Sequence, residues 1–212
     1  MTISYPLSTP AGLGVRNLTM RAMNVVGVSE SPFTKKQQVI EFEGKAWSAA
    51  VTLPPLNRAD AQKWIAFLLA LKGPVGTFIL KDPSKSTPLG SASTTPGTPL
   101  VNGASQSGDQ IILDGMPSNA SGYLLAGDYI QFNTGSAAQL HTVLTDVDTD
   151  GSGNATVDIW PSIRTNSPPA DNAVVVVSDC GGVFRLISRT TEWSVDEAMI
   201  HGITFEATEV LV

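Results

Sequence analysis

The stretch that decides the fold runs from residue 47 to residue 74 and reads WSAAVTLPPLNRADAQKWIAFLLALKGP. From Trp47 to Leu53, every second residue is apolar and faces one side, which is the period of a half-buried β-strand. Further on, apolar residues recur at helical spacing, at Ala61, Trp64, Ile65, Leu68 and Leu71. The stretch therefore predicts a strand that leads into an amphipathic helix.

Residues at both ends of this helix are suited to start and stop it. Asn57 can cap the first turn, and the carboxylate of Asp60 favours the positive end of the helix dipole. The segment Lys72-Gly73-Pro74 closes the helix and prevents its continuation. We expect a helix over residues 57–72, which is about four turns at 3.6 residues per turn.

Strands are expected on both sides of the helix. Gln37–Phe42 is predicted to pair with residues 47–53 across a turn at Glu43-Gly44-Lys45. After the helix, Gly76–Leu80 predicts a further strand that ends at Asp82-Pro83. This N-terminal part has too few strands to close a sheet or barrel around its helix.

The middle of the chain has a different composition. Residues 83–108 are rich in Ser, Thr, Pro and Gly, which indicates a linker or a long irregular crossing. Short strands separated by turn residues follow and favour a small antiparallel barrel or sandwich. These predicted strands are Gln110–Leu113, Tyr129–Phe132, His141–Val147, Ala155–Trp160 and Val174–Val177.

Longer apolar patterns return near the C-terminus. Strands are predicted at Val183–Leu186, Thr191–Val195 and Met199–Leu211, and in the last of these the side chains at positions 203, 205 and 207 face one side. We expect these strands to complete the sheet that the N-terminal part begins.

Charge separates the middle of the chain from its ends. Residues 1–90 and 182–212 together carry twelve Lys or Arg and ten Asp or Glu, a net charge of +2. Residues 91–181 carry one basic residue, Arg164, and nine Asp, a net charge of −8. We therefore predict one β domain with a single helix, residues 1–90 plus 182–212, and an inserted acidic all-β domain, residues 91–181. The predicted fold class is mainly β with one packed α-helix, carrying an inserted small all-β barrel or sandwich.

The composition argues against several classes of function. Charged residues make up 15% of the chain, below the roughly 25% that is typical, which suits either a heavily β chain or a surface largely covered by partners. Neither part has the basic stripe that nucleic-acid binding needs. No apolar run approaches the roughly 18 residues of a membrane span, and the first ten residues lack a secretory pattern. We expect no specific nucleic acid and no membrane insertion.

Catalytic chemistry is not indicated. Two histidines, His141 and His201, are the only candidate bases, and neither lies near a serine in a nucleophile turn. Phosphate-binding glycine motifs are absent from the sequence. The single cysteine, Cys180, cannot form an internal disulfide and is interpreted as a small filler residue. We predict that the chain is not an enzyme and has no catalytic or cofactor-binding residues.

A weak metal candidate lies at Asp146, Asp148 and Asp150. Carboxylates at alternate positions followed by Gly151 match the first half of a calcium loop. The position where a bidentate glutamate is needed holds Val157, however, and the flanks read as strands. The preferred interpretation is a hairpin with Asp150-Gly151 at its tip and the other two carboxylates in water, and no metal is assigned.

The aromatic residues allow two uses. A platform for stacking sugars could form around Trp160, Tyr123 and Tyr129, although no motif signals it. Packing in the core is the preferred use of the remaining tryptophans, Trp47, Trp64 and Trp193.

Several of these segments resemble a known family. Residues 47–56, 61–68 and 71–78, followed by Asp82-Pro83, are similar to small minor tail proteins of long-tailed phages, above all to the distal tail protein family of siphophages. Residues 125–164 are similar to the β inserts of such proteins. The resemblance implies a tail-tube-like β domain with a packed helix, six copies in a homo-oligomeric ring beneath the tail tube, and a peripheral β module. The implied partners are further copies of the chain, the tail tube protein and the baseplate hub or tip proteins, and the implied location is the virion tail tip after assembly in the host cytoplasm. No binding residue is carried over from the family.

Three hypotheses for the function follow. The first is a structural virion protein that forms a ring joining the tail tube to the tip hub. The second is an adhesin whose insert binds host-surface glycan, and the third is a hydrolase that uses paired aspartates. We prefer the first because a ring subunit repeats one contact in which the neighbour can satisfy edge strands.

Overall fold

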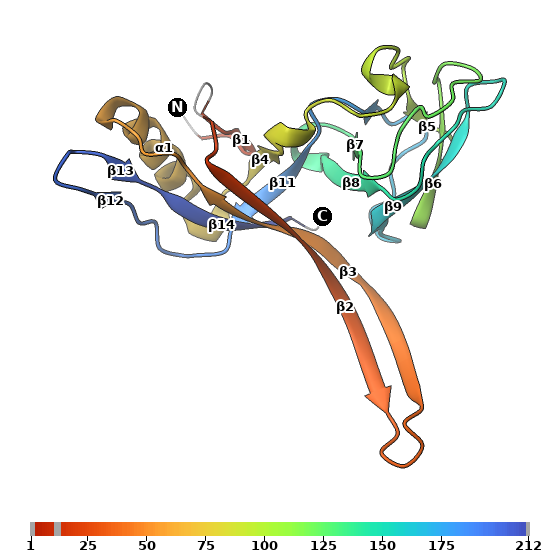
Figure 1. Ribbon diagram of the computed structural model, residues 1–212, viewed down its shortest axis with the longest axis horizontal. Coiled ribbons are helices and arrows are strands. Elements are labelled where there is room, and N and C mark those ends of the chain that lie inside the picture. The colour runs from red at the N-terminus through yellow and green to blue at the C-terminus, as the bar shows by residue number, and fades with distance from the viewer. Residues whose placement is uncertain (1–2, 11–13, 211–212) are drawn as a thin grey trace.

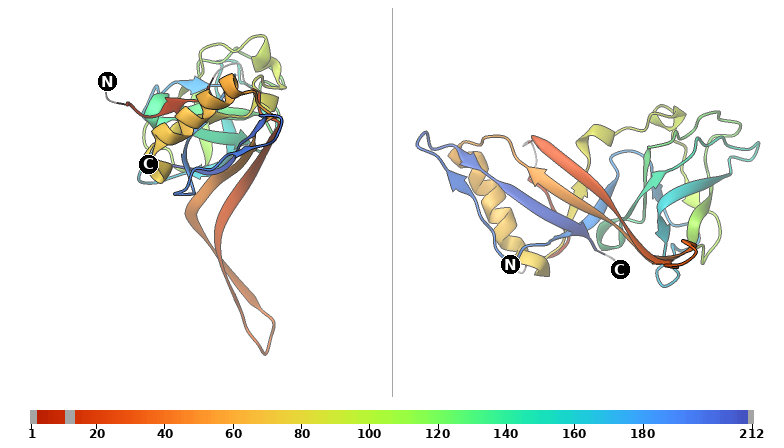
Figure 2. Two further views of the ribbon diagram at one scale, coloured as in Figure 1. Left: turned by 90° about the vertical axis from the view of Figure 1, so that its left-hand side faces the viewer. Right: turned by 60° about the horizontal axis from the view of Figure 1, so that its bottom comes forward.

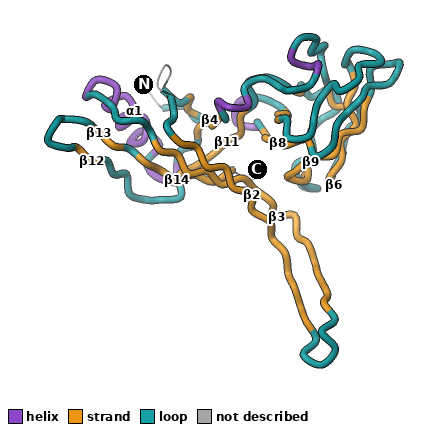
Figure 3. The backbone as a smooth tube through the Cα atoms, viewed as in Figure 1, coloured by secondary structure: helices purple, strands orange, loops and turns teal. Residues whose placement is uncertain are grey.

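The computed structural model describes residues 3–10 and 14–210, and it is mainly β with one α-helix in this part of the chain (Figure 1). The predicted fold class is confirmed. Short 3-10 helices interrupt the connections, at η1 (Gly73–Val75), η2 (Pro83–Lys85), η3 (Ser91–Ser93) and η4 (Gly135–Ala137). Figure 3 shows how much of the remainder is loop, mostly in the middle of the chain.

The first sheet joins both ends of the chain. Its strand order is β1-β4-β11-β14-β3-β2. All neighbours are antiparallel except the pair of β1 and β4. The strands are β1 (Leu7–Ser8), β2 (Asn17–Glu30), β3 (Gln37–Thr52), β4 (Phe78–Lys81), β11 (Gly181–Leu186) and β14 (Thr204–Glu209). Since β11 and β14 lie between β4 and β3, the prediction that the C-terminal strands complete this sheet is confirmed.

The helix α1 (Arg58–Leu71) packs on this sheet. The Asn57 side chain accepts a hydrogen bond from the Asp60 backbone N–H at 3.0 Å, as predicted for the cap. Lys72 ends the helix in the left-handed conformation, with φ 53°. The apolar face of the helix meets Phe78 of β4 and Phe205 of β14 in one core. Burial of this face, more than helix propensity, stabilises a helix of this length.

The second sheet is built by the middle of the chain and curls into a small barrel. Its order is β10-β7-β8-β9-β6-β5. A bridge between Leu100 and Val174 brings the two outer strands together. The strands are β5 (Leu100–Val101), β6 (Gly108–Asp114), β7 (Tyr129–Phe132), β8 (Gln139–Val143), β9 (Ala155–Ile163) and β10 (Val175–Val176). Its separate core includes Ile111, Phe132 and Ile159.

The largest difference from prediction lies in residues 17–46. Gln37–Phe42 does not fold back on residues 47–53, because both belong to the single long strand β3. The partner of β3 is β2, a strand of 14 residues that the sequence analysis misses. Glu43-Gly44-Lys45 forms a bulge in β3, where the register shifts between Met23 and Val25 of β2. A glycine beside charged residues suits a bulge as well as a turn, which is why the prediction was wrong.

The segment after β11 also differs from prediction. Only Ser194–Val195 of the strand expected at 191–195 is extended as β12, and it pairs with β13 (His201–Gly202) in a small hairpin. Trp193 is exposed at 44%, so its predicted place in the core is wrong. The hairpin extends beyond α1, where little of the chain covers it (Figures 1 and 2).

Candidate functional site

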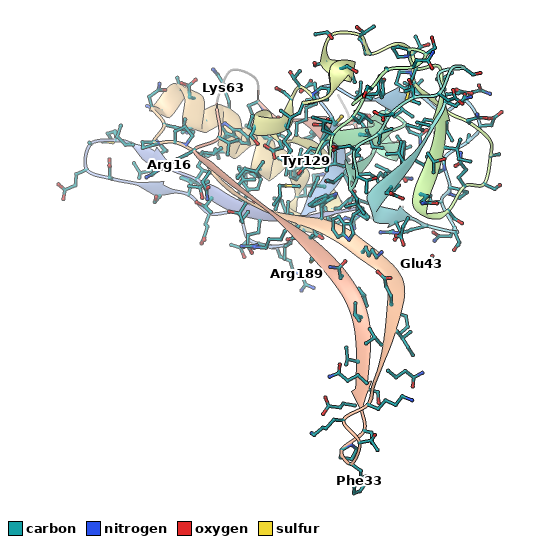
Figure 4. The ribbon with its side chains drawn as sticks, turned by 45° about the vertical axis from the view of Figure 1, so that its right-hand side comes forward. Arg16, Phe33, Glu43, Lys63, Tyr129 and Arg189 are labelled. Carbon is teal, nitrogen blue, oxygen red and sulfur yellow. The ribbon has the colours of Figure 1, made fainter. Side chains whose placement is uncertain are left out.

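A long two-stranded arm is the most unusual surface of the molecule. We define the arm as residues 24–42, the outer halves of β2 and β3 with the turn between them. It projects away from the rest of the molecule in Figure 1 and in the left-hand view of Figure 2, and Figure 4 shows Phe33 at its tip. Every residue of the arm except Ser31 is exposed.

Local chemistry explains why the arm forms. The turn at 31–36 is closed by two backbone hydrogen bonds, Ser31 N–H to Lys36 O at 3.0 Å and Lys35 N–H to Ser31 O at 2.9 Å. On each side of it, β-branched residues favour an extended chain. Cross-strand pairs run in register from Val25 opposite Phe42 to Glu30 opposite Gln37.

Both faces of the arm are apolar although both are in solvent. One face carries Val25 opposite Phe42, and Ile40 opposite Gly27. The other face carries Val26, Val28 and Val39, and the last two are each 61% exposed. A two-stranded ribbon is marginally stable in water by itself, and large exposed apolar patches mark contact surfaces.

The edges of the arm are open as well. β2 is the last strand of its sheet, and β14 pairs with β3 only from Ser48 to Thr52. Within the described residues, the outer backbone N–H and C=O groups of the arm therefore have no strand beside them. Such edges pair readily with a strand of another chain.

The barrel holds the base of the arm. The Trp160 indole N–H donates to the Asn24 side-chain oxygen at 2.9 Å, and the Thr165 hydroxyl donates to the Glu43 carboxylate at 3.0 Å. Trp160 also packs edge-on against Trp47, with 4.5 Å between ring centroids. These contacts fix where the arm leaves the body.

A nearly buried lysine reinforces this base. The Lys45 ammonium reaches Glu41 of the arm at 2.6 Å and Asp109 of the barrel at 3.1 Å, and it donates to the Ser162 hydroxyl at 2.8 Å. Burial lowers the pKa of Lys45, but the hydrogen bonds to the two carboxylates outweigh burial and raise it overall. The lysine thus stays charged and links arm and barrel.

A second polar cluster lies where the first sheet meets the barrel. The Glu209 carboxylate accepts from the Trp47 backbone N–H at 3.0 Å, and burial raises the pKa of Glu209 to about 7. The imidazole of His141 lies close to the Pro161 carbonyl, at 2.6 Å, and burial lowers its pKa to about 4. Both side chains, with Arg164, line a small pocket with room for little more than a water molecule. The pocket offers no space for a substrate.

The three carboxylates of the calcium candidate serve separate loops. Asp146 accepts from the Ala126 N–H, Asp148 from the Gly122 N–H, and Asp150 from the N–H groups of the turn that follows it. In the described part of the chain, no three acidic, histidine or cysteine side chains gather as a metal site. The three aspartates are exposed turn residues, and they stabilise loop backbone through these hydrogen bonds.

The other candidates lie mostly inside the molecule. Tyr123 and Tyr129 are buried, so the stacking platform proposed around them and Trp160 does not exist as an exposed surface. Trp47 and Trp64 pack in the core, as predicted. His201 and Cys180 are buried too, and burial raises the pKa of the Cys180 thiol to about 12.

Sequence reasoning missed the arm, although one signal was present. The segment Ser31–Lys36 is a polar turn flanked by two runs rich in β-branched residues.

Comparisons with protein-family models and with curated proteins gave no match to this chain. No helix of the described residues has the length and apolarity to cross a membrane.

Proposed function

We propose that this chain is a structural virion protein that forms a ring at the distal end of a phage tail and joins the tail tube to the tip or baseplate hub. The observation that carries the proposal is the arm. It exposes apolar side chains on both faces and open backbone on both edges. These are properties of a surface that another protein covers.

A ring needs one contact repeated around an axis, between two different patches of the same chain. The arm supplies a patch that extends away from the rest of the molecule (Figure 1 and the left-hand view of Figure 2). Its base is fixed by Lys45 and Trp160, so its direction is set before a neighbour arrives. Preorganisation of this kind reduces the entropy lost on association.

In the proposed ring, the acidic barrel is suited to an outward position. It is built by consecutive residues between β4 and β11, and its net charge is opposite in sign to that of the rest of the chain. A peripheral module leaves the first sheet free for the contacts of the ring.

The proposal is tested on the purified protein by light scattering after gel filtration and by negative-stain microscopy. We expect rings with a central hole, and we expect a variant with residues 26–41 replaced by Asn-Gly to fold but fail to assemble. The Asn-Gly pair suits a two-residue hairpin turn. As a control, Val75→Ser removes an exposed apolar side chain outside the arm and should leave the rings intact.

Two results would contradict the proposal. One is a wild-type protein that remains a monomer at micromolar concentration. The other is a short-armed variant that still forms the same rings, because the arm would then not be the assembling surface.

A further inference from the structure

The tip of the arm presents one large apolar side chain to solvent. Phe33 is 94% exposed, which is the highest value among the exposed large apolar residues. The turn that carries it is closed by backbone hydrogen bonds, so Phe33 is held outward. Lys35 at this tip pairs with Glu30 at 3.0 Å, while Lys36 has no ion-pair partner among the described residues.

An apolar groove lies at the other end of the molecule, beside α1. Its floor is formed by Leu68 of α1, Leu186 of β11 and Phe205 of β14. Its wall is formed by the segment after β11, through Ile187, Ser188, Thr190, Thr191 and Glu192. Its volume is about 290 Å³. This is close to the lower end of the range of roughly 300–1,000 Å³ for binding pockets, and an aromatic side chain needs less space than a whole ligand.

The groove also borders an open strand edge. β11 pairs with β14 at residues 207–209, and the Ile187 N–H still donates to the Glu206 carbonyl at 3.1 Å, so the pairing ends at Glu206. Thr204 and Phe205 therefore have β3 on one side and no strand on the other within the described residues. A backbone segment that enters the groove can pair with this edge.

The charges of groove and tip are complementary. The residues that line the groove include two glutamates, Glu192 and Glu206, and no lysine or arginine. The tip, residues 30–38, carries two lysines and one glutamate, a net charge of +1. Arg21 already contacts Glu206 at 3.3 Å, so Glu192 is the acceptor at the rim of the groove that Lys36 can reach.

From these observations we infer that Phe33 of one copy inserts into the groove of a second copy. The arm points away from α1 and β14 in Figures 1 and 2, so a molecule cannot fill its own groove. The contact joins two different patches and therefore propagates from copy to copy. The inference rests on the proposed function, because it names the residues through which copies of the chain would assemble.

Disulfide trapping between variants that each carry one added cysteine tests the contact. Thr34→Cys places a thiol beside Phe33, and Thr190→Cys places one on the wall of the groove, where both residues are exposed. The natural Cys180 is buried and does not interfere. A mixture of the two variants under mild oxidation should form a covalent dimer, and Thr34→Cys mixed with Leu89→Cys, also exposed, should not.

A second variant ties the trapping to the aromatic ring. Adding Phe33→Ser to Thr34→Cys should abolish the dimer and weaken assembly about tenfold or more, as expected for a buried aromatic anchor. If light scattering detects rings but the cysteines of Thr34→Cys and Thr190→Cys do not form a disulfide, the contact is refuted and the ring proposal survives. If the wild-type chain does not assemble at all, both fail.

Discussion

Glu209 offers the sharpest test of the interior, because its environment opposes its charge. The carboxylate lies at the end of β14 where the first sheet meets the barrel, and burial raises its pKa from 4.5 to about 7. Hydrogen bonds from the Trp47 and Leu140 backbone and the positive charge of Arg164 lower this pKa, but burial outweighs them. At neutral pH and above, folding therefore forces a charge into a poorly solvated position.

The sign and size of the effect follow from linkage. A carboxyl group with a folded pKa above its unfolded pKa contributes stability that is fully present below pH 4.5 and is lost as the pH rises through about 7. At about 1.36 kcal/mol per pKa unit, the loss is roughly 3 kcal/mol. Glu209→Gln keeps an acceptor for the Trp47 N–H and carries no charge. We expect this variant to match wild type at pH 4.5 and to exceed its unfolding free energy by up to roughly 3 kcal/mol at pH 8.

Urea denaturation followed by tryptophan fluorescence at several pH values measures this difference. His141 titrates in the same range with the opposite sign, since its stabilising contribution is present above pH 6.5 and is lost as the pH falls toward about 4. Subtracting the unfolding free energy of the wild type from that of the variant at each pH removes the contribution of His141, which both proteins contain. Glu206→Gln, on the solvent side of the same strand, should change stability by less than about 0.5 kcal/mol. The reasoning would be refuted if the difference in unfolding free energy between Glu209→Gln and wild type stayed constant from pH 5 to pH 8.

Three further predictions concern the core and the loops. Leu71→Ala should lower the unfolding free energy by about 2–5 kcal/mol, because Leu71 is fully buried between helix and sheet; a loss below 1 kcal/mol in urea would contradict this. Asp128→Ala should cost about 3 kcal/mol, since its buried carboxylate accepts from three backbone N–H groups, whereas Asp171→Ala, at an exposed loop, should cost less than 1 kcal/mol by the same assay. The melting temperature should be the same in calcium and in chelator, because the carboxylates of residues 146–150 bind separate backbone groups; a calcium-dependent rise would revive the metal site.

Local signals made the helix and its surroundings predictable. Asn57 and the Lys72-Gly73-Pro74 segment act on residues next to them, so their effect can be read without the rest of the chain. The strand at 47–53 was predictable because one of its faces is buried, which writes a two-residue period into the sequence. The pairing of both chain ends followed from counting strands.

The arm could not be predicted by the same means. Residues 24–30 have no buried face, so apolar and polar positions do not alternate there, and the strand signal disappears. The polar cluster escaped for a different reason. His141, Arg164 and Glu209 come from distant parts of the chain, and only the meeting of sheet and barrel brings them to one pocket. Trp193 was predicted in the core because a strand was expected over residues 191–195. Only residues 194–195 form a strand, so Trp193 lies outside it.

The point where the barrel leaves the first sheet has a consequence for engineering. Lys81 of β4 and Gly181 of β11 are direct partners in the ladder, so all of the intervening chain occupies the position of a hairpin loop. A foreign module whose own ends lie close together could be grafted there without disturbing strand order. Such a graft would have to supply a new cover for Trp47, whose indole N–H now donates to the Leu140 carbonyl of the barrel. If a graft meets this condition, the first sheet can carry different inserted domains between β4 and β11.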